Sequence, residues 1–163
     1  MKNNQFAVQQ LFNDSELACV LAGQDTETSD MSKAQQLSYI VSEVKELADA
    51  LEQSDLVEQL DACNDILVTT FGYMLKLEQQ GALLNKSMLK TGANNLTKFP
   101  TSKEVAEKTV EFYLQTKNKE CTINFNAEHG KFVVRDKNGK YLKPFGFVEN
   151  NLSDCFMKEL VEQ

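Results

Sequence analysis

Hydrophobic positions in the first half of the chain repeat with helical spacing. Between residues 33 and 52, apolar side chains recur every three or four positions, at Leu37, Ile40, Val41, Val44, Leu47, Ala48 and Leu51. A second stripe runs from residue 55 to about 78, through Val57, Leu60, Cys63, Asn64, Leu67, Phe71, Met74 and Leu75. Because only a short turn separates these stripes, they predict an antiparallel pair of helices.

Shorter apolar patterns flank this pair. Phe6, Val8, Leu11 and Phe12 predict a first helix that extends through residues 17–21, and residues 82–90 predict a fourth, shorter helix. A polar, turn-rich loop at residues 23–31 should end in a helix cap from Ser29, Asp30 or Ser32. We expect residues 1–99 to form a four-helix bundle.

The pattern changes after Pro100. Residues 102–116 predict one more helix, and the stretches CTINF and KFVVRD then alternate in polarity on either side of a turn near His129. They predict a β-hairpin, and residues 152–161 predict a closing helix. The expected fold class is therefore mainly α, with a small C-terminal α+β extension at residues 100–163.

Composition places the chain among soluble globular proteins. Its 163 residues are 42% hydrophobic and 25% charged, with two prolines. No stretch is apolar enough to span a bilayer, and the N-terminal residues do not resemble a secretory signal, so we expect a cytoplasmic protein. The four cysteines lie far apart and, with one histidine, do not form a zinc-binding motif.

Charge is distributed unevenly along the chain. The net charge of −7 argues against binding to nucleic acid or to an anionic membrane. Residues 1–80 carry 4 basic and 14 acidic side chains, a net of −10, whereas residues 81–163 carry 13 basic and 10 acidic side chains, a net of +3. The acidic half could therefore hold cations, and the basic half an anion.

Five carboxylates lie beside the apolar stripes of the two central helices. At about 100° per residue, Glu43 and Glu46 fall on one side of Ile40. On the next helix the acids likewise fall on one side of Leu60, namely Glu58, Asp61 and Asp65. Side chains three or four residues apart stack one turn apart, so each row could share a hard divalent cation. A solvated helix surface is the simpler interpretation, and the pattern alone leaves both open.

The same residues resemble a known family. The sequences EVKE at 43–46 and EQLDACNDIL at 58–67 are similar to the E-x-x-E and E-x-x-D motifs of the all-α NTP pyrophosphohydrolases. This MazG-like superfamily also contains dimeric dUTPases and phosphoribosyl-ATP pyrophosphohydrolase. With the following VTTFG, the stretch closely resembles bacterial and phage phosphoribosyl-ATP pyrophosphohydrolase-like members, and the resemblance covers residues 33–81.

The resemblance implies a set of site residues. It assigns Glu43, Glu46, Asp61 and Asp65 as ligands of Mg²⁺, with Mn²⁺ as an alternative ion; Glu58 is the acid of the literal E-x-x-D pattern, so Glu58 or Asp65 completes the set. The catalytic candidates are Glu46 and Glu58, either of which could accept a proton from the attacking water. Ser42 departs from the family pattern, which has a second glutamate there.

A weaker resemblance concerns the basic half. The sequence NNLTKF at 94–99 is similar to a segment that follows the bundle in these relatives, and implies nucleotide and phosphate contacts from Asn95 and Lys98. The sequence DKNGKYLKP at 136–144 is similar to another such segment and offers Lys143 as a phosphate contact, although loop lysines are usually only solvated.

The resemblance implies an enzyme that hydrolyses a nucleoside triphosphate to a monophosphate and pyrophosphate. Relatives assemble as dimers or tetramers, so it also implies a homodimer or homotetramer. Two alternatives remain: a noncatalytic sensor of nucleotide or metal, and a helical adaptor whose acidic face binds a basic protein.

Overall fold

The structure, a computed structural model, describes residues 4–24 and 28–157. In these ranges the fold is mainly α, with five α-helices, one two-stranded antiparallel hairpin and one 3-10 turn. This confirms the expected fold class. None of the described helices is both long enough and apolar enough to cross a membrane.

The chain divides into two compact units. The first unit comprises Met1–Leu84 with Cys155–Gln163, and the second comprises Asn85–Asp154. Because compactness does not measure independent folding, the boundary expected at residue 99 stays a prediction.

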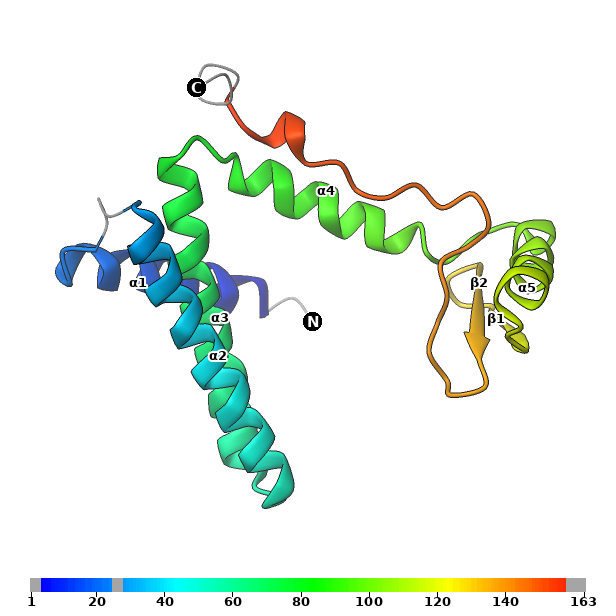
Figure 1. Cartoon of the computed structure of the whole chain (residues 1–163), viewed down its shortest axis with the longest axis horizontal. Coiled ribbons are helices and arrows are strands. Elements are labelled where there is room, and N and C mark those ends of the chain that lie inside the picture. Colours follow the sequence, from blue (N-terminus) through cyan, green and yellow to red (C-terminus); the bar gives the residue numbers. More distant parts are fainter. Residues whose placement is uncertain (1–3, 25–27, 158–163) are drawn as a thin grey trace. The chain divides into compact units, whose positions relative to one another are not determined.

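In the first unit, two long helices form the expected antiparallel pair (Figure 1). Helix α2 spans Asp30–Glu52 and helix α3 spans Leu56–Gln79. Ser29 caps α2, because its side chain accepts a hydrogen bond from Ser32 N, as predicted. Asp55 caps α3 by accepting from the backbone N–H groups of Val57 and Glu58. The turn between them places Ser54 in the left-handed region, with φ of 56°.

Helix α1, Asn4–Leu21, packs on α3, and the rings of Phe12 and Phe71 meet edge to face with centroids 5.0 Å apart. The end of the described chain returns to the turn after α3. Leu83 N donates to Cys155 O at 2.7 Å, and Met157 N donates to Gly81 O at 3.0 Å. The predicted closing helix is only a 3-10 turn at Ser153–Cys155 where the chain is described, and residues 158–161 lie outside the described residues.

The predicted core stripe of the central helices is wrong in part. Ile40 and Leu47 are half-buried, as expected, and Ala50 and Ala62 are buried. Phe71 and Leu75 are buried and Met74 is half-buried, also as expected. The other large apolar positions of the two stripes are exposed on this chain, at Leu37, Val41, Val44, Leu51, Val57, Leu60 and Leu67. The buried positions of α2 carry small or polar side chains, Ser32, Gln36 and Ala50, and the last two are hydrogen-bonded to α3.

In the second unit, helix α5 (Lys103–Lys117) packs on a hairpin of strands β1 (Cys121–Asn126) and β2 (Lys131–Asp136). The strands pair from Cys121 with Asp136 to Asn126 with Lys131, which confirms the predicted hairpin. Ala106 from α5, Val134 from β2 and Leu142 from the following segment form a small buried core. Thr109 is also buried, and its hydroxyl accepts from Phe145 N at 2.9 Å.

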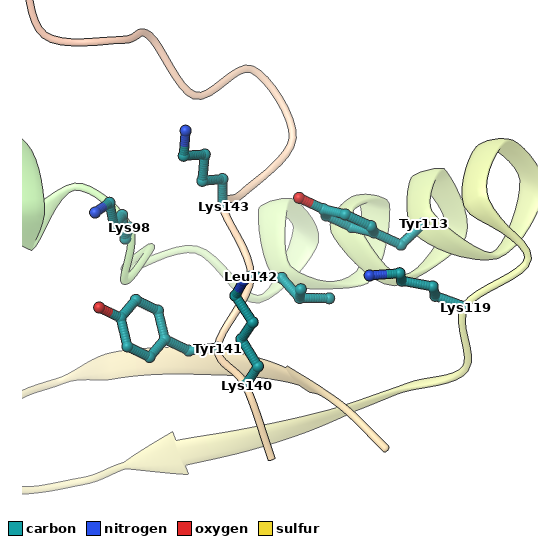
Figure 2. Close-up of a pocket in the computed structure, with 7 residues that line it drawn as sticks. All are labelled: Lys98, Tyr113, Lys119, Lys140, Tyr141, Leu142 and Lys143. Carbon is teal, nitrogen blue, oxygen red and sulfur yellow. The ribbon is translucent and has the colours of Figure 1, made fainter. Parts of the chain in front are cut away.

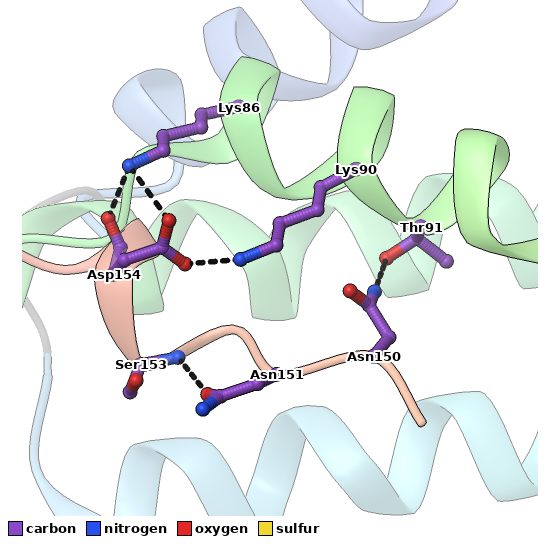
Figure 3. Close-up of polar contacts among 7 residues, drawn as sticks. All are labelled: Lys86, Lys90, Thr91, Asn150, Asn151, Ser153 and Asp154. Carbon is purple, nitrogen blue, oxygen red and sulfur yellow. Dashed lines mark hydrogen bonds and ion pairs between the residues drawn. The ribbon is translucent and has the colours of Figure 1, made fainter. Parts of the chain in front are cut away.

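Helix α4 spans Leu84–Leu96 and is longer than predicted. The segment of residues 148–154 is tied to α4 by several polar contacts (Figure 3). Asn94 donates to Val148 O at 3.0 Å, and Asn150 donates to the hydroxyl of Thr91 at 3.0 Å. The carboxylate of Asp154 pairs with both Lys86 and Lys90. These contacts support the turn of helix beyond Gly92 that the sequence pattern did not predict.

Candidate functional site

Two side-chain hydrogen bonds fix how α2 and α3 lie against each other. Near one end of the pair, Gln59 Nε2 donates to Ala50 O at 3.3 Å. Farther along, the buried Gln36 donates from Nε2 to Thr69 O at 2.8 Å. In an antiparallel pair, the stretch 36–50 of α2 therefore faces the stretch 59–69 of α3.

Four of the five candidate acids lie within these facing stretches. Glu43 and Glu46 fall between the two contacts on α2, and Asp61 and Asp65 fall between them on α3. Glu58 lies in the first turn of α3, just outside the facing stretch, and is exposed. The helix register therefore groups Asp65, rather than Glu58, with the other three acids.

The electrostatics of Glu43 agree with this grouping. The pKa of Glu43 is raised above its ordinary value of 4.5, first by partial burial and then by the negative charges of Glu46, Asp65 and Asp61. Glu43 is half-buried, whereas Glu46 and Asp61 are exposed and Asp65 is half-buried. Four carboxylates that repel one another at a partly exposed helix seam form a set of hard oxygen donors suited to a divalent cation.

The carboxylates do not converge on one point as they stand. Within residues 4–24 and 28–157, no three His, Cys, Asp or Glu side chains are placed together to hold a metal ion. Carboxylate side chains on helices can change rotamer, and the positive charge of a bound cation would draw these four together. The donor chemistry fits Mg²⁺, while the assignment of individual ligands stays a prediction.

The basic candidates all belong to the second unit. Lys98 Nζ donates to Asn95 Oδ1 at 2.7 Å, so these two residues act as a pair. Lys143 forms an ion pair with Glu149, and its Nζ also lies 5.2 Å from the ring centroid of Phe147. Lys98 and Lys143 line one pocket, together with residues that the sequence pattern did not single out (Figure 2). Their contact with a nucleotide stays a prediction.

Sequence reasoning missed the residue that sets the helix register. Gln36 is polar and sits beside the apolar positions of α2, so periodicity alone assigns it to the surface. Its burial depends on Gly72 of α3, where the absence of a side chain makes room for the amide. A glycine at 72 inside a strongly apolar helix was the available signal, because an interior glycine usually has a packing reason.

Residues 16–80 match the family model described as phosphoribosyl-ATP pyrophosphohydrolase. No curated protein matched the chain significantly, and no solved structure did so either. The matched segment runs from the middle of α1 to the end of α3 and contains all five candidate acids. The match confirms the resemblance to the all-α NTP pyrophosphohydrolases and supports a pyrophosphohydrolase-type function on nucleotides. Residues 16–80, which are 65 of the 163 residues, are thus similar to the phosphoribosyl-ATP pyrophosphohydrolase family, whose members typically use divalent metal ions.

Proposed function

We propose that the chain is a Mg²⁺-dependent hydrolase that cleaves a nucleoside triphosphate or deoxynucleoside triphosphate to its monophosphate and pyrophosphate. The observation that supports this most is the grouping of Glu43, Glu46, Asp61 and Asp65 along the facing stretches of α2 and α3. This grouping lies inside the segment that matches the pyrophosphohydrolase family. We place the reaction in the cytoplasm, where such nucleotides are abundant.

In this proposal the four acids hold Mg²⁺, which when bound supplies charge neutralisation and a more acidic water. Glu58 lies outside the facing stretch and remains available as the proton acceptor, with Glu46 as the alternative. For the second unit taken by itself, we propose Asn95, Lys98 and Lys143 as contacts for a nucleotide and its phosphates. Ammonium groups suit this role because they form charge-assisted hydrogen bonds with phosphate oxygens.

The proposal is tested by product analysis. The full chain is incubated with Mg²⁺ and, one at a time, with the common nucleoside and deoxynucleoside triphosphates and with phosphoribosyl-ATP. Equimolar monophosphate and pyrophosphate are expected from at least one of them, and EDTA should abolish the reaction. Release of inorganic phosphate and a diphosphate, or no turnover of any compound, would contradict it.

A noncatalytic nucleotide or metal sensor is the second candidate. It is favoured by Ser42, a hydroxyl at a position where the family pattern has a carboxylate. A sensor would bind a nucleotide with Mg²⁺ without forming products. Ser42→Glu then offers a direct comparison, because a rise in turnover in this variant would show that the missing carboxylate limits the rate.

We also propose that a second copy of the chain covers the exposed apolar face of α2 and α3. Val41 and Val44 are 60% and 51% exposed on α2, and Leu60 is 65% exposed on α3, so large apolar side chains of both helices meet water on the single chain. Burying it in a homodimer or homotetramer would complete a helical bundle. Sedimentation at micromolar concentration should show an oligomer, and Val44→Asp should weaken it. The control is Lys45→Asp, at the adjacent exposed position, which should leave the oligomer unchanged. A compact wild-type monomer would contradict this proposal.

A further inference from the structure

Four lysines from three separate segments line one pocket of the second unit. The pocket has a volume of about 400 Å³ and is lined by Lys98, Lys119, Lys140 and Lys143, with Tyr113 and Tyr141 (Figure 2). Lys98 follows α4, Lys119 follows α5, and Lys140 and Lys143 follow β2. A volume of this size is typical of small-molecule sites.

The backbone that carries these lysines is anchored. Between Lys140 and Lys143, Leu142 is buried in the core of the unit, and its N–H donates to Val134 O at 2.8 Å. The N–H of Lys119 donates to Tyr113 O at 3.1 Å, which folds the end of α5 back on itself. The positions of the pocket residues are therefore set by the fold and not by a free loop.

Aromatic packing holds the remaining wall. The rings of Phe99 and Tyr141 lie with centroids 5.3 Å apart, next to Lys98 in the chain. Tyr113 is half-buried on α5, and its hydroxyl end lies on the pocket side in the close-up (Figure 2). The wall therefore offers phenolic hydroxyl groups and ring faces beside the ammonium groups.

Few of the pocket lysines have an ion-pair partner, although Asp136 and Glu120 line an adjoining hollow that shares Lys119. Lys143 pairs with Glu149, but across residues 4–24 and 28–157 no carboxylate lies within ion-pair distance of Lys98, Lys119 or Lys140. No acidic side chain lines the pocket among the described residues. The second unit as a whole carries 12 basic and 8 acidic side chains over residues 85–154, a net of +4. Like charges gathered in this way repel one another unless an anion joins them.

We propose that this pocket binds an oligophosphate anion, either free pyrophosphate or the phosphate chain of a nucleotide, without the aid of a metal ion. Several adjacent negative charges match several ammonium groups better than one carboxylate or monovalent anion would. Tyrosine hydroxyl groups add donors to phosphate oxygens. For Lys98 and Lys143 the proposal deepens the proposed function, which already assigns them phosphate contacts, but metal-free binding with Lys119 and Lys140 does not require hydrolysis.

The test is calorimetric titration of the full chain in EDTA, with pyrophosphate and with ATP as separate ligands. One site per chain is expected for at least one of the two, and comparison of the two affinities separates a site for free pyrophosphate from a site for a nucleotide. In the double variant Lys119→Ala/Lys140→Ala, we expect the Kd to rise at least about tenfold, which corresponds to about 1.4 kcal/mol.

The matched control is Lys103→Ala/Lys108→Ala. It also removes two positive charges, but from lysines of α5 that are exposed, that pair with Glu107 and Glu104, and that do not line the pocket. We expect it to change the Kd by less than about threefold, a difference well below the 1.4 kcal/mol that a tenfold change represents. Circular dichroism confirms that both double variants fold; if the pocket variant does not, single substitutions at the two positions replace it.

Any of three titration results would overturn the proposal: no binding of either ligand at millimolar concentration, equal weakening by both double variants, or tighter binding of an oligothymidylate that displaces pyrophosphate. The last result would identify a nucleic-acid site instead. Asp61→Asn separates this proposal from the hydrolase, because that variant should still bind pyrophosphate in EDTA even though it no longer turns over substrate. Loss of pyrophosphate binding in this variant, with its fold intact, would show that binding is not confined to the pocket and would refute the proposal.

Discussion

The amide of Gln36 occupies the space that a side chain at Gly72 would fill. A Cβ atom at residue 72 would lie 2.7 Å from Gln36 Nε2, closer than real contacts allow. Gln36 in turn donates to Thr69 O at 2.8 Å, and the Thr69 hydroxyl donates to Asp65 O at 2.7 Å. The close approach of α2 and α3 at this point fixes which acids of the two helices face each other.

Gly72→Ala should therefore destabilise the chain. Alanine favours a helix over glycine by roughly 0.5–1 kcal/mol, but displacing the buried Gln36 amide costs about 1–3 kcal/mol through overpacking. We expect a net loss of about 1–2 kcal/mol in the free energy of unfolding, measured by urea denaturation. The control is Gly92→Ala in α4, where a Cβ would meet no atom within 4 Å. It should stabilise by up to about 1 kcal/mol, and an equal gain at both glycines would show that Gln36 moves aside freely.

Glu43→Gln should raise the thermal stability of the metal-free protein at neutral pH. The pKa of Glu43 is raised above 4.5 in the folded state, so ionising this carboxyl lowers the free energy of unfolding. The full stability is present below pH 4.5 and is lost as the pH rises through the folded pKa. Removing the charge should relieve about 0.2–0.5 kcal/mol, the scale of a like-charge pair on a helix. The gain should vanish in thermal scans below pH 4.5, and a gain that persists there would need another cause.

The acid tolerance of the second unit should depend on Asp154. The hydrogen bonds from Lys90 and Lys86 lower the pKa of Asp154 from 3.8 to about 2. A lowered pKa stabilises the folded state above 3.8, and this stabilisation is lost as pH falls through about 2. Asp154→Asn should thus lower the melting temperature at pH 5–7 and converge with wild type near pH 2. Glu128→Gln, in the exposed hairpin turn, is the control, and an equal effect in both variants would rule out the lysine contacts as the cause.

Glu46→Gln and Asp61→Asn should each reduce turnover of the preferred nucleotide at least about 100-fold, because each removes a charge that stabilises the reacting phosphates through the bound ion. The fold should be intact, since both side chains are exposed. Asp49→Asn tests specificity, because Asp49 is an exposed acid of the same helix that does not contribute to the raised pKa of Glu43. Undiminished rates in both site variants would refute the assignment.

Much of the fold was predictable because its signals are local. The caps at Ser29 and Asp55 and the alternation of the two strands are read from neighbouring residues. The length of α4 was not predictable, because Gly92 and Asn94 look like helix breakers. Asn94 instead donates a hydrogen bond to Val148 O, more than fifty residues later in the chain. The facing side of α2 was misassigned because it carries Gln36 and Ala50, whereas periodicity follows the large apolar side chains on the exposed side.

The candidate site likewise has a part that the sequence predicts and a part that depends on tertiary contacts. Spacing alone puts Glu43 with Glu46 and Asp61 with Asp65, since these pairs lie one turn apart. Choosing between Asp65 and Glu58 required the register set by Gln36, which is a contact across 33 residues. The predicted hairpin returns the chain towards the end of α5, but the pocket that Lys119 and Lys140 line also depends on the packing of Leu142 against Ala106 of α5, a tertiary contact that spacing does not give.

The most direct test of the central claim is a titration of Mn²⁺, monitored by its electron paramagnetic resonance signal, into the wild-type chain, Asp65→Asn and Glu58→Gln. If the four facing acids bind a divalent cation, the wild type binds Mn²⁺ and Glu58→Gln binds it with the same Kd. In Asp65→Asn the Kd for Mn²⁺ should rise at least about tenfold, which corresponds to about 1.4 kcal/mol. Binding that is unchanged in Asp65→Asn, or absent from the wild type even with nucleotide added, would contradict the claim.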